Sequence, residues 1–127
     1  MIDERMINMN NMNDILEIVG PKEAFDRGNL FENYFWPYKY VANVKADNER
    51  QSLMNKVQEY CFSAHELNLY LDLHPDDMQA IGLFNQYTEM ADKYTKEYEM
   101  KYGPITVGIT EKYPWQWMNS PWPWERL

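Results

Sequence analysis

Two stretches with the same apolar spacing constrain the fold of this chain more than any other feature. Within residues 47–73, apolar side chains recur at steps of four, three, four, three and four: Leu53, Val57, Tyr60, Ala64, Leu67 and Leu71. In the stretch that follows, up to Tyr102, a second set repeats these steps: Ala80, Phe84, Tyr87, Ala91, Tyr94 and Tyr98. Residues spaced in this way share one face of an α-helix. The pattern predicts two long helices, each with one apolar stripe.

The residues between the two stripes predict a sharp reversal of the chain. Residues 74–77 read His-Pro-Asp-Asp, and Pro75 suits the first turn of a helix because the amide hydrogen it lacks has no partner there. The two aspartates complement the positive end of the helix dipole. The dipeptide Gly103-Pro104 then ends the second helix. Long helices with so short a connection pack as an antiparallel hairpin, which makes the expected fold all-α.

The segments before the hairpin differ from it in character. Residues 1–19 are rich in methionine and asparagine, and we expect a mobile leader because little apolar surface is available to offset the entropy of ordering. Residues 20–46 are expected to form an arm with a short helix between Pro21 and Gly28. An aromatic cluster follows in the arm, and Pro37 keeps it out of a helix. Its candidate contact residues are Phe35, Trp36 and Tyr38.

A dense group of tryptophans marks the C-terminal part of residues 47–127. Four of the five tryptophans lie within ten residues: Trp115, Trp117, Trp122 and Trp124. Four exposed indole rings would form a larger apolar patch than monomeric proteins usually tolerate. Prolines within the tail favour extended backbone, so we expect a non-helical tail that packs on something. It either covers its own hairpin and completes the core, or inserts rings into a partner or a second copy.

Composition excludes several classes of function. The chain has 20 acidic and 12 basic residues and a formal net charge of -8, which argues against a nucleic-acid binder. We find no apolar run of the roughly 18 residues that a membrane span needs. The first residues carry acidic charge and lack an apolar stretch, so we expect no secretory signal. The single cysteine, Cys61, excludes an intramolecular disulfide and a zinc site with several cysteines.

Two constellations of reactive residues were weighed, and neither predicts catalysis. Cys61 and His65 lie four residues apart and could pair as thiolate and imidazole, but no oxyanion-binding loop accompanies them. The hairpin tip gathers possible metal ligands, yet the Glu-x-x-His pattern of dimetal helical bundles is absent. We interpret the tip residues as turn and capping chemistry and assign no catalytic residue, metal or cofactor. These acidic-tip residues are Asp72, His74, Asp76 and Asp77.

The segment from Val57 to Asp92 contains seven acidic residues and no lysine or arginine. Such a charge run is either a solvated face or a docking surface for a basic partner.

Several motifs together resemble the spore coat protein CotJB family over about residues 53–127. They are Leu69-Tyr70-Leu71-Asp72, His74-Pro75-Asp76-Asp77, Ala80, Phe84-Asn85-Gln86-Tyr87, Tyr102-Gly103-Pro104, Tyr113-Pro114-Trp115-Gln116-Trp117 and Pro121-Trp122-Pro123-Trp124-Glu125. Upstream, shorter motifs look like the C-terminal part of the companion CotJA family: Pro21-Lys22-Glu23-Ala24-Phe25, Gly28-Asn29-Leu30-Phe31 and Pro37-Tyr38. The long proline-rich start of CotJA is missing. The chain is thus either a CotJA-like segment fused to CotJB, or a CotJB with an extended arm.

The resemblance implies a non-enzymatic structural or adaptor polypeptide. It would be made in the mother-cell cytoplasm of an endospore-forming bacterium and deposited in the inner spore coat. The implied partners are CotJA-like coat proteins and CotJC, a manganese-catalase-like coat protein, and the single apolar seam makes self-association expected. Two alternatives remain open: manganese handling by the acidic tip, and oxidative cross-linking through exposed tyrosines.

Overall fold

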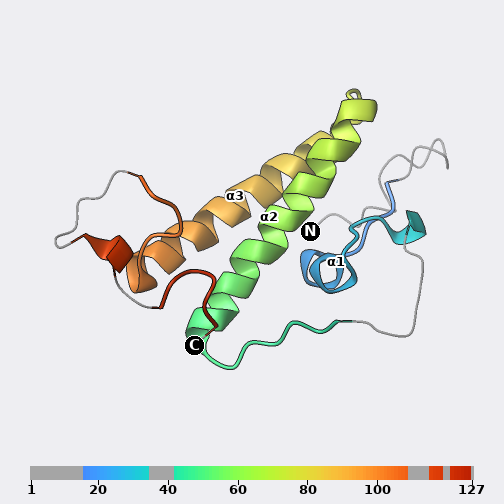
Figure 1. The fold of residues 1–127 in the computed structure, drawn as a ribbon. Coiled ribbons are helices and arrows are strands. Elements are labelled where there is room, and N and C mark those ends of the chain that lie inside the picture. The colour runs from blue at the N-terminus through green and yellow to red at the C-terminus, as the bar shows by residue number, and fades with distance from the viewer. Residues whose placement is uncertain (1–15, 35–41, 109–114, 119–120, 127) are drawn as a thin grey trace.

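The computed structural model describes residues 16–34, 42–108, 115–118 and 121–126. Within them the elements are the helices α1 (Pro21–Arg27), α2 (Glu49–Leu73) and α3 (Met78–Tyr102) and the 3-10 turns η2 (Glu32–Tyr34) and η3 (Gln116–Met118). The two long helices α2 and α3 pack side by side, and α1 packs against α2 (Figure 1). The all-α hairpin that the two apolar stripes predicted is confirmed.

Side chains at the ends of the long helices set their limits. Asn48 caps α2 by accepting a hydrogen bond of 2.8 Å from the backbone N–H of Gln51. Asp77 caps α3 in the same way, at 3.1 Å from the N–H of Ala80. Pro75 therefore lies in the turn rather than in the first turn of α3, which corrects the sequence-based expectation. A carboxylate one step before the helix satisfies an N–H group there, and a proline ring cannot.

Two groups of buried side chains form the core. The larger group lies where α1 packs on the hairpin: Leu16, Ile18, Ala24, Leu30, Ala64, Leu67, Ala80, Leu83 and Tyr87. The smaller group joins the beginning of α2 to the end of α3: Met54, Val57 and Tyr98. Members of both predicted stripes occur in each group. The stripes therefore form the seam of the hairpin, as expected.

An N-terminal loop closes over α2 and includes part of the expected leader. Leu16 and Ile18 are buried, at 3% and 5% exposure. Ile18 forms an isolated antiparallel bridge with Phe31. The N–H of Val19 donates to the carbonyl of Leu30 at 3.0 Å. Residues 16–19 are thus packed, not mobile, because alternating apolar side chains on an extended segment bury one face against the hairpin.

The arm and the tail are described in part. The short helix predicted between Pro21 and Gly28 is present, and Gly28 ends it with a left-handed φ of 80°. Residues 1–15 and the aromatic candidates Phe35, Trp36 and Tyr38 lie outside the described residues. The tail is not wholly irregular, since η3 adds one 3-10 turn that the sequence analysis did not foresee. None of the helices described is both long and apolar enough to cross a membrane.

Leu30 tests how much the N-terminal loop contributes to stability. Its side chain is fully buried, and truncation in Leu30→Ala leaves a cavity beneath α1. We expect a loss of about 2–5 kcal/mol in the free energy of unfolding, measured by urea denaturation followed by circular dichroism. Leu69→Ala removes the same atoms from a side chain that is 50% exposed and serves as the control. Equal losses in the two variants would contradict the packing of this loop.

Candidate interaction site at the tryptophan tail

A buried arginine holds the backbone of the tail. Arg50 lies in the first turn of α2 and is 8% exposed. Its guanidinium donates to the carbonyl oxygens of Trp122 and Glu125, both at 2.6 Å. The guanidinium carbon also lies 5.7 Å from the centre of the Tyr98 ring on α3. One cation thus joins the tail to both long helices, and its planar fork of donors suits two neighbouring carbonyl groups.

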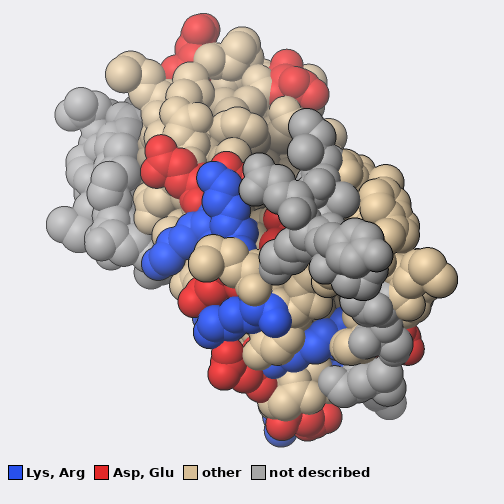
Figure 2. All heavy atoms as spheres, turned by 90° about the vertical axis from the view of Figure 1, so that its left-hand side faces the viewer, with Lys and Arg blue, Asp and Glu red and all other residues tan. Residues whose placement is uncertain are grey.

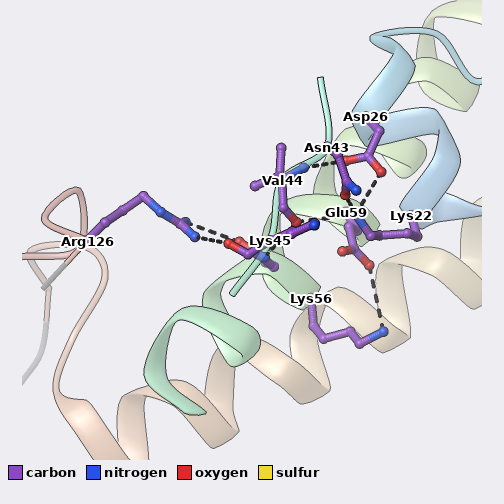
Figure 3. A network of polar contacts seen from close by, with 9 residues as sticks. Lys22, Asp26, Asn43, Val44, Lys45, Lys56, Glu59 and Arg126 are labelled. Carbon is purple, nitrogen blue, oxygen red and sulfur yellow. Dashed lines mark hydrogen bonds and ion pairs between the residues drawn. The ribbon is translucent and has the colours of Figure 1, made fainter. Parts of the chain in front are cut away.

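Arg126 makes the reciprocal contact, from the tail back to the hairpin. It donates to the side-chain oxygens of Asn55 and Gln51, both at 3.2 Å, and to the carbonyl of Lys45 at 2.8 Å. The amide of Gln51 returns a bond of 2.9 Å to the carbonyl of Arg126. Lys45 belongs to residues 43–47, the strap, which leads into α2. Figure 3 shows Arg126 reaching the strap from the side of the tail. These bonds fix the tail, the strap and the first turns of α2 together.

The four tail tryptophans differ in how far their rings are exposed. Trp122 lies between two rings, with its centroid 6.0 Å from that of Trp117 and 4.9 Å from that of Trp124. Trp117 and Trp122 are partly buried. Trp115 and Trp124 instead remain 48% and 68% exposed. The tail therefore packs on its own hairpin, one of the two predicted alternatives, and still presents two indole rings to solvent.

A groove lies between the tail and the end of α3. Its volume is about 350 Å³, and its walls include Tyr102, Pro104, Trp117 and Trp122. Trp117 and Trp122 therefore contribute both to the packing of the tail and to the surface of the groove. Polar contacts hold residues 122–126, which include the outward ring of Trp124, and the ring of Trp117 in the same short segment as Trp115 packs on Trp122.

Further along the same side of α2, the strap is fixed to α1. The ammonium of Lys22 contacts a carboxylate oxygen of Asp26 at 2.7 Å and the carbonyl of Val44 at 3.2 Å. The N–H of Val44 donates to the second oxygen of Asp26 at 3.0 Å. Beside this network lies Glu59, only 3% exposed, with Lys56 at 3.8 Å (Figure 3). Burial raises the pKa of the Glu59 carboxyl, and the nearby Lys56 and Lys22 offset only part of that effect.

Sequence reasoning missed this buried polar side of α2. It consists of Arg50, Gln51, Asn55, Glu59 and Ser63. The last four recur at steps of four and therefore share one ridge of the helix. In sequence, such a polar ridge looks like a solvent-exposed face of the helix. It is buried only because the strap, the tail and α1 pack over it. The sequence does contain one signal of this buried ridge, which is the run of polar residues at i,i+4 spacing beside the apolar stripe.

At the hairpin tip, His74 and Asp77 take part in the turn and in helix capping. The hydroxyl of Tyr70 donates to the carboxylate of Asp77 at 2.8 Å. The ring of His74 stacks on that of Tyr70, with centroids 4.1 Å apart and planes 9° apart. Asp72 and Asp76 are exposed. No three His, Cys, Asp or Glu side chains within the described ranges are grouped as a metal site.

Cys61 and His65 are both exposed on α2. Desolvation, with a contribution from the charge of Asp92, raises the pKa of the Cys61 thiol. A raised pKa disfavours the thiolate that a nucleophile requires. The environment of Cys61 is therefore typical of an unreactive thiol.

Glu59 predicts a pH-dependent difference in stability. A carboxyl whose pKa is raised by folding destabilises the folded state at pH values above that pKa. This penalty declines as the pH falls through the raised pKa towards the ordinary value of 4.5. Glu59→Gln should therefore unfold at higher urea concentration than the wild type at pH 7, and the gain should shrink towards pH 4.5. The exposed Glu89→Gln is the control, and a gain that is independent of pH would contradict the assignment.

Arg50 tests the attachment of the tail. Arg50→Met leaves two tail carbonyls without their charged donor, and we expect a loss of about 2–4 kcal/mol in the free energy of unfolding. Tryptophan emission should shift to longer wavelength as Trp117 and Trp122 gain contact with water. The exposed Lys96→Met provides the matched control. Unchanged emission together with an unchanged urea midpoint would rule out the arginine as the anchor.

Comparison with known proteins places this hairpin and tail in a family. Residues 51–125, more than half of the chain, match the family model described as CotJB protein. Neither the curated proteins nor the solved structures contain a match to the chain. The matched region runs from the first turn of α2 through the docked tail, so it includes both helices of the hairpin and all four clustered tryptophans. The chain therefore belongs to the CotJB family, a family of spore coat proteins.

Proposed function

We propose that this protein is a non-enzymatic structural adaptor of the inner spore coat. In this proposal it is made in the mother-cell cytoplasm and assembles with CotJA-like proteins and with the manganese-catalase-like CotJC. Family membership carries the role in the spore coat. The assembly with these partners, and the self-association expected from the sequence, are the parts that require experiment.

One observation carries the adaptor role: two large indole rings point outward from an ordered support. Trp115 and Trp124 are 48% and 68% exposed, although the tail that bears them is bound through Arg50. Tryptophan is enriched among the residues that dominate protein–protein binding energy. A ring that is already fixed in place loses little conformational entropy when a partner covers it. The exposed pair is therefore the proposed contact, and Trp117 and Trp122 support it from within.

The two alternative functions have less support. Manganese handling would need several ligands grouped at the tip, but no three His, Cys, Asp or Glu side chains of the described residues are grouped there, and Asp77 already accepts hydrogen bonds from Tyr70 and Ala80. Oxidative cross-linking needs accessible phenol rings, whereas Tyr87 and Tyr98 are 4% and 2% exposed. These residues serve the turn and the core of the fold. The proposed adaptor contact instead consists of Trp115 and Trp124, which remain largely exposed.

The test is co-expression with the manganese-catalase-like protein, followed by size-exclusion chromatography with light scattering. We expect a defined complex for the wild type. Trp115→Ala combined with Trp124→Ala should weaken it by about tenfold or more, because both rings belong to the contact. The same double variant should keep its urea midpoint, since the rings are largely outside the core.

Met100→Ala removes another exposed apolar side chain, 79% exposed on α3, and is the matched control. It should leave the complex intact. A complex that survives the double tryptophan substitution would show that the partner binds elsewhere. Absence of any complex with the wild-type protein would remove the adaptor proposal itself.

A further inference from the structure

The end of the hairpin exposes an unusual concentration of large apolar side chains. We call residues 69–81, the end of α2, the turn and the beginning of α3, the hairpin knob. Four of its side chains are exposed: Leu69 by 50%, Leu73 by 81%, Met78 by 84% and Ile81 by 39%. Figure 1 shows this end of the hairpin projecting beyond α1, away from the tail. Exposed apolar groups concentrated in this way mark interaction sites in folded proteins.

The stretch of sequence that contains the knob carries charges of one sign. Seven acidic residues and no lysine or arginine lie between Val57 and Asp92. Some of the carboxylates have partners within the fold, as Glu66 does by accepting from the N–H of Leu30. Four exposed ones form no ion pair with the described residues: Asp72, Asp76, Glu89 and Asp92. In Figure 2 the upper end of the visible face shows acidic and uncharged residues, whereas the lysine and arginine side chains gather lower down.

This combination specifies the chemistry of what binds there. Apolar contacts at the centre of an interface supply affinity, and charges at its rim select the partner. A second copy bringing the same knob would add like charge, and an anionic lipid surface would be repelled. We propose that the hairpin knob docks into a basic, apolar-lined segment of another polypeptide, whose lysine or arginine side chains face Asp72 and Asp76.

The knob lies at the opposite end of the molecule from the tryptophan tail. The tail is fixed at Arg50, in the first turn of α2, and Leu73 is the last residue of that helix. A helix rises 1.5 Å per residue, so about 35 Å separates the two sites. The two sites therefore do not overlap, and binding at one leaves the other exposed. This second interface goes beyond the proposed adaptor contact and does not depend on the tail tryptophans.

The test uses the full chain and a fluorescein-labelled helical peptide of leucine and lysine with one leucine face. Fluorescence anisotropy should detect binding that weakens as salt is added. Leu73→Ser combined with Met78→Ser should raise the dissociation constant about tenfold or more, and Asp72→Asn combined with Asp76→Asn should also raise it. All four side chains are exposed, so the variants should keep the urea midpoint of the wild type.

Two matched variants control for position. Met100→Ser with Val107→Ser removes exposed apolar side chains elsewhere, and Asp47→Asn with Glu49→Gln removes two exposed charges at the far end of α2. Neither should change binding, and a peptide with glutamate in place of lysine should not bind. The proposal is overturned if the wild type does not bind the lysine peptide, or if the controls weaken binding as much as the knob variants do. It is likewise overturned if the knob substitutions abolish binding to phosphatidylcholine vesicles or self-association while peptide binding persists.

Discussion

A hairpin of two helices can bury only one face of each, and the rest of this structure depends on how the other sides of α2 are covered. The seam with α3 takes up the apolar stripe that includes Val57 and Leu67. Towards the turn, the loop around α1 covers a further side of α2 and buries Leu30 and Ala24 completely. Towards the beginning of α2, the cover is supplied by the strap and the tail. The central helix is thereby buried on more than one side, although its sequence shows a single apolar stripe.

The strap and the tail cover the beginning of α2 through polar contacts. This explains how a tail rich in tryptophan can dock without burying all of its rings. The anchoring energy comes from Arg50, Gln51 and Arg126, which bond to backbone carbonyls and side-chain amides. Buried polar groups require good partners, because each one left unpaired costs more than an ordinary hydrogen bond contributes. Such a network therefore specifies one position for the tail. The outward rings of Trp115 and Trp124 are then available on a support that does not have to be ordered on binding.

The chain also separates two kinds of surface along its length. The end of the hairpin that carries the tail has exposed rings and also the ion pair of Lys101 with Glu49, at 2.9 Å. At the hairpin knob, exposed apolar groups lie among carboxylates that have no nearby lysine or arginine in the sequence. The rigid pair of long helices keeps these surfaces apart. A short protein built in this way is suited to holding two different neighbours in a coat.

The sequence by itself determined the long helices, their turn and their seam, because these depend on local spacing and on capping residues such as Asn48 and Asp77. It also identified the tryptophan tail as a segment that must pack, and it indicated the family through motifs in the same region. The tertiary structure alone decided that Ile18 belongs to the core and that Glu59 is buried, since both depend on segments distant in sequence. It also decided which tryptophans remain exposed. Apolar periodicity predicts the environment of a helix face only when a single neighbour covers it, whereas α2 is covered by α3, by the loop around α1, by the strap and by the tail.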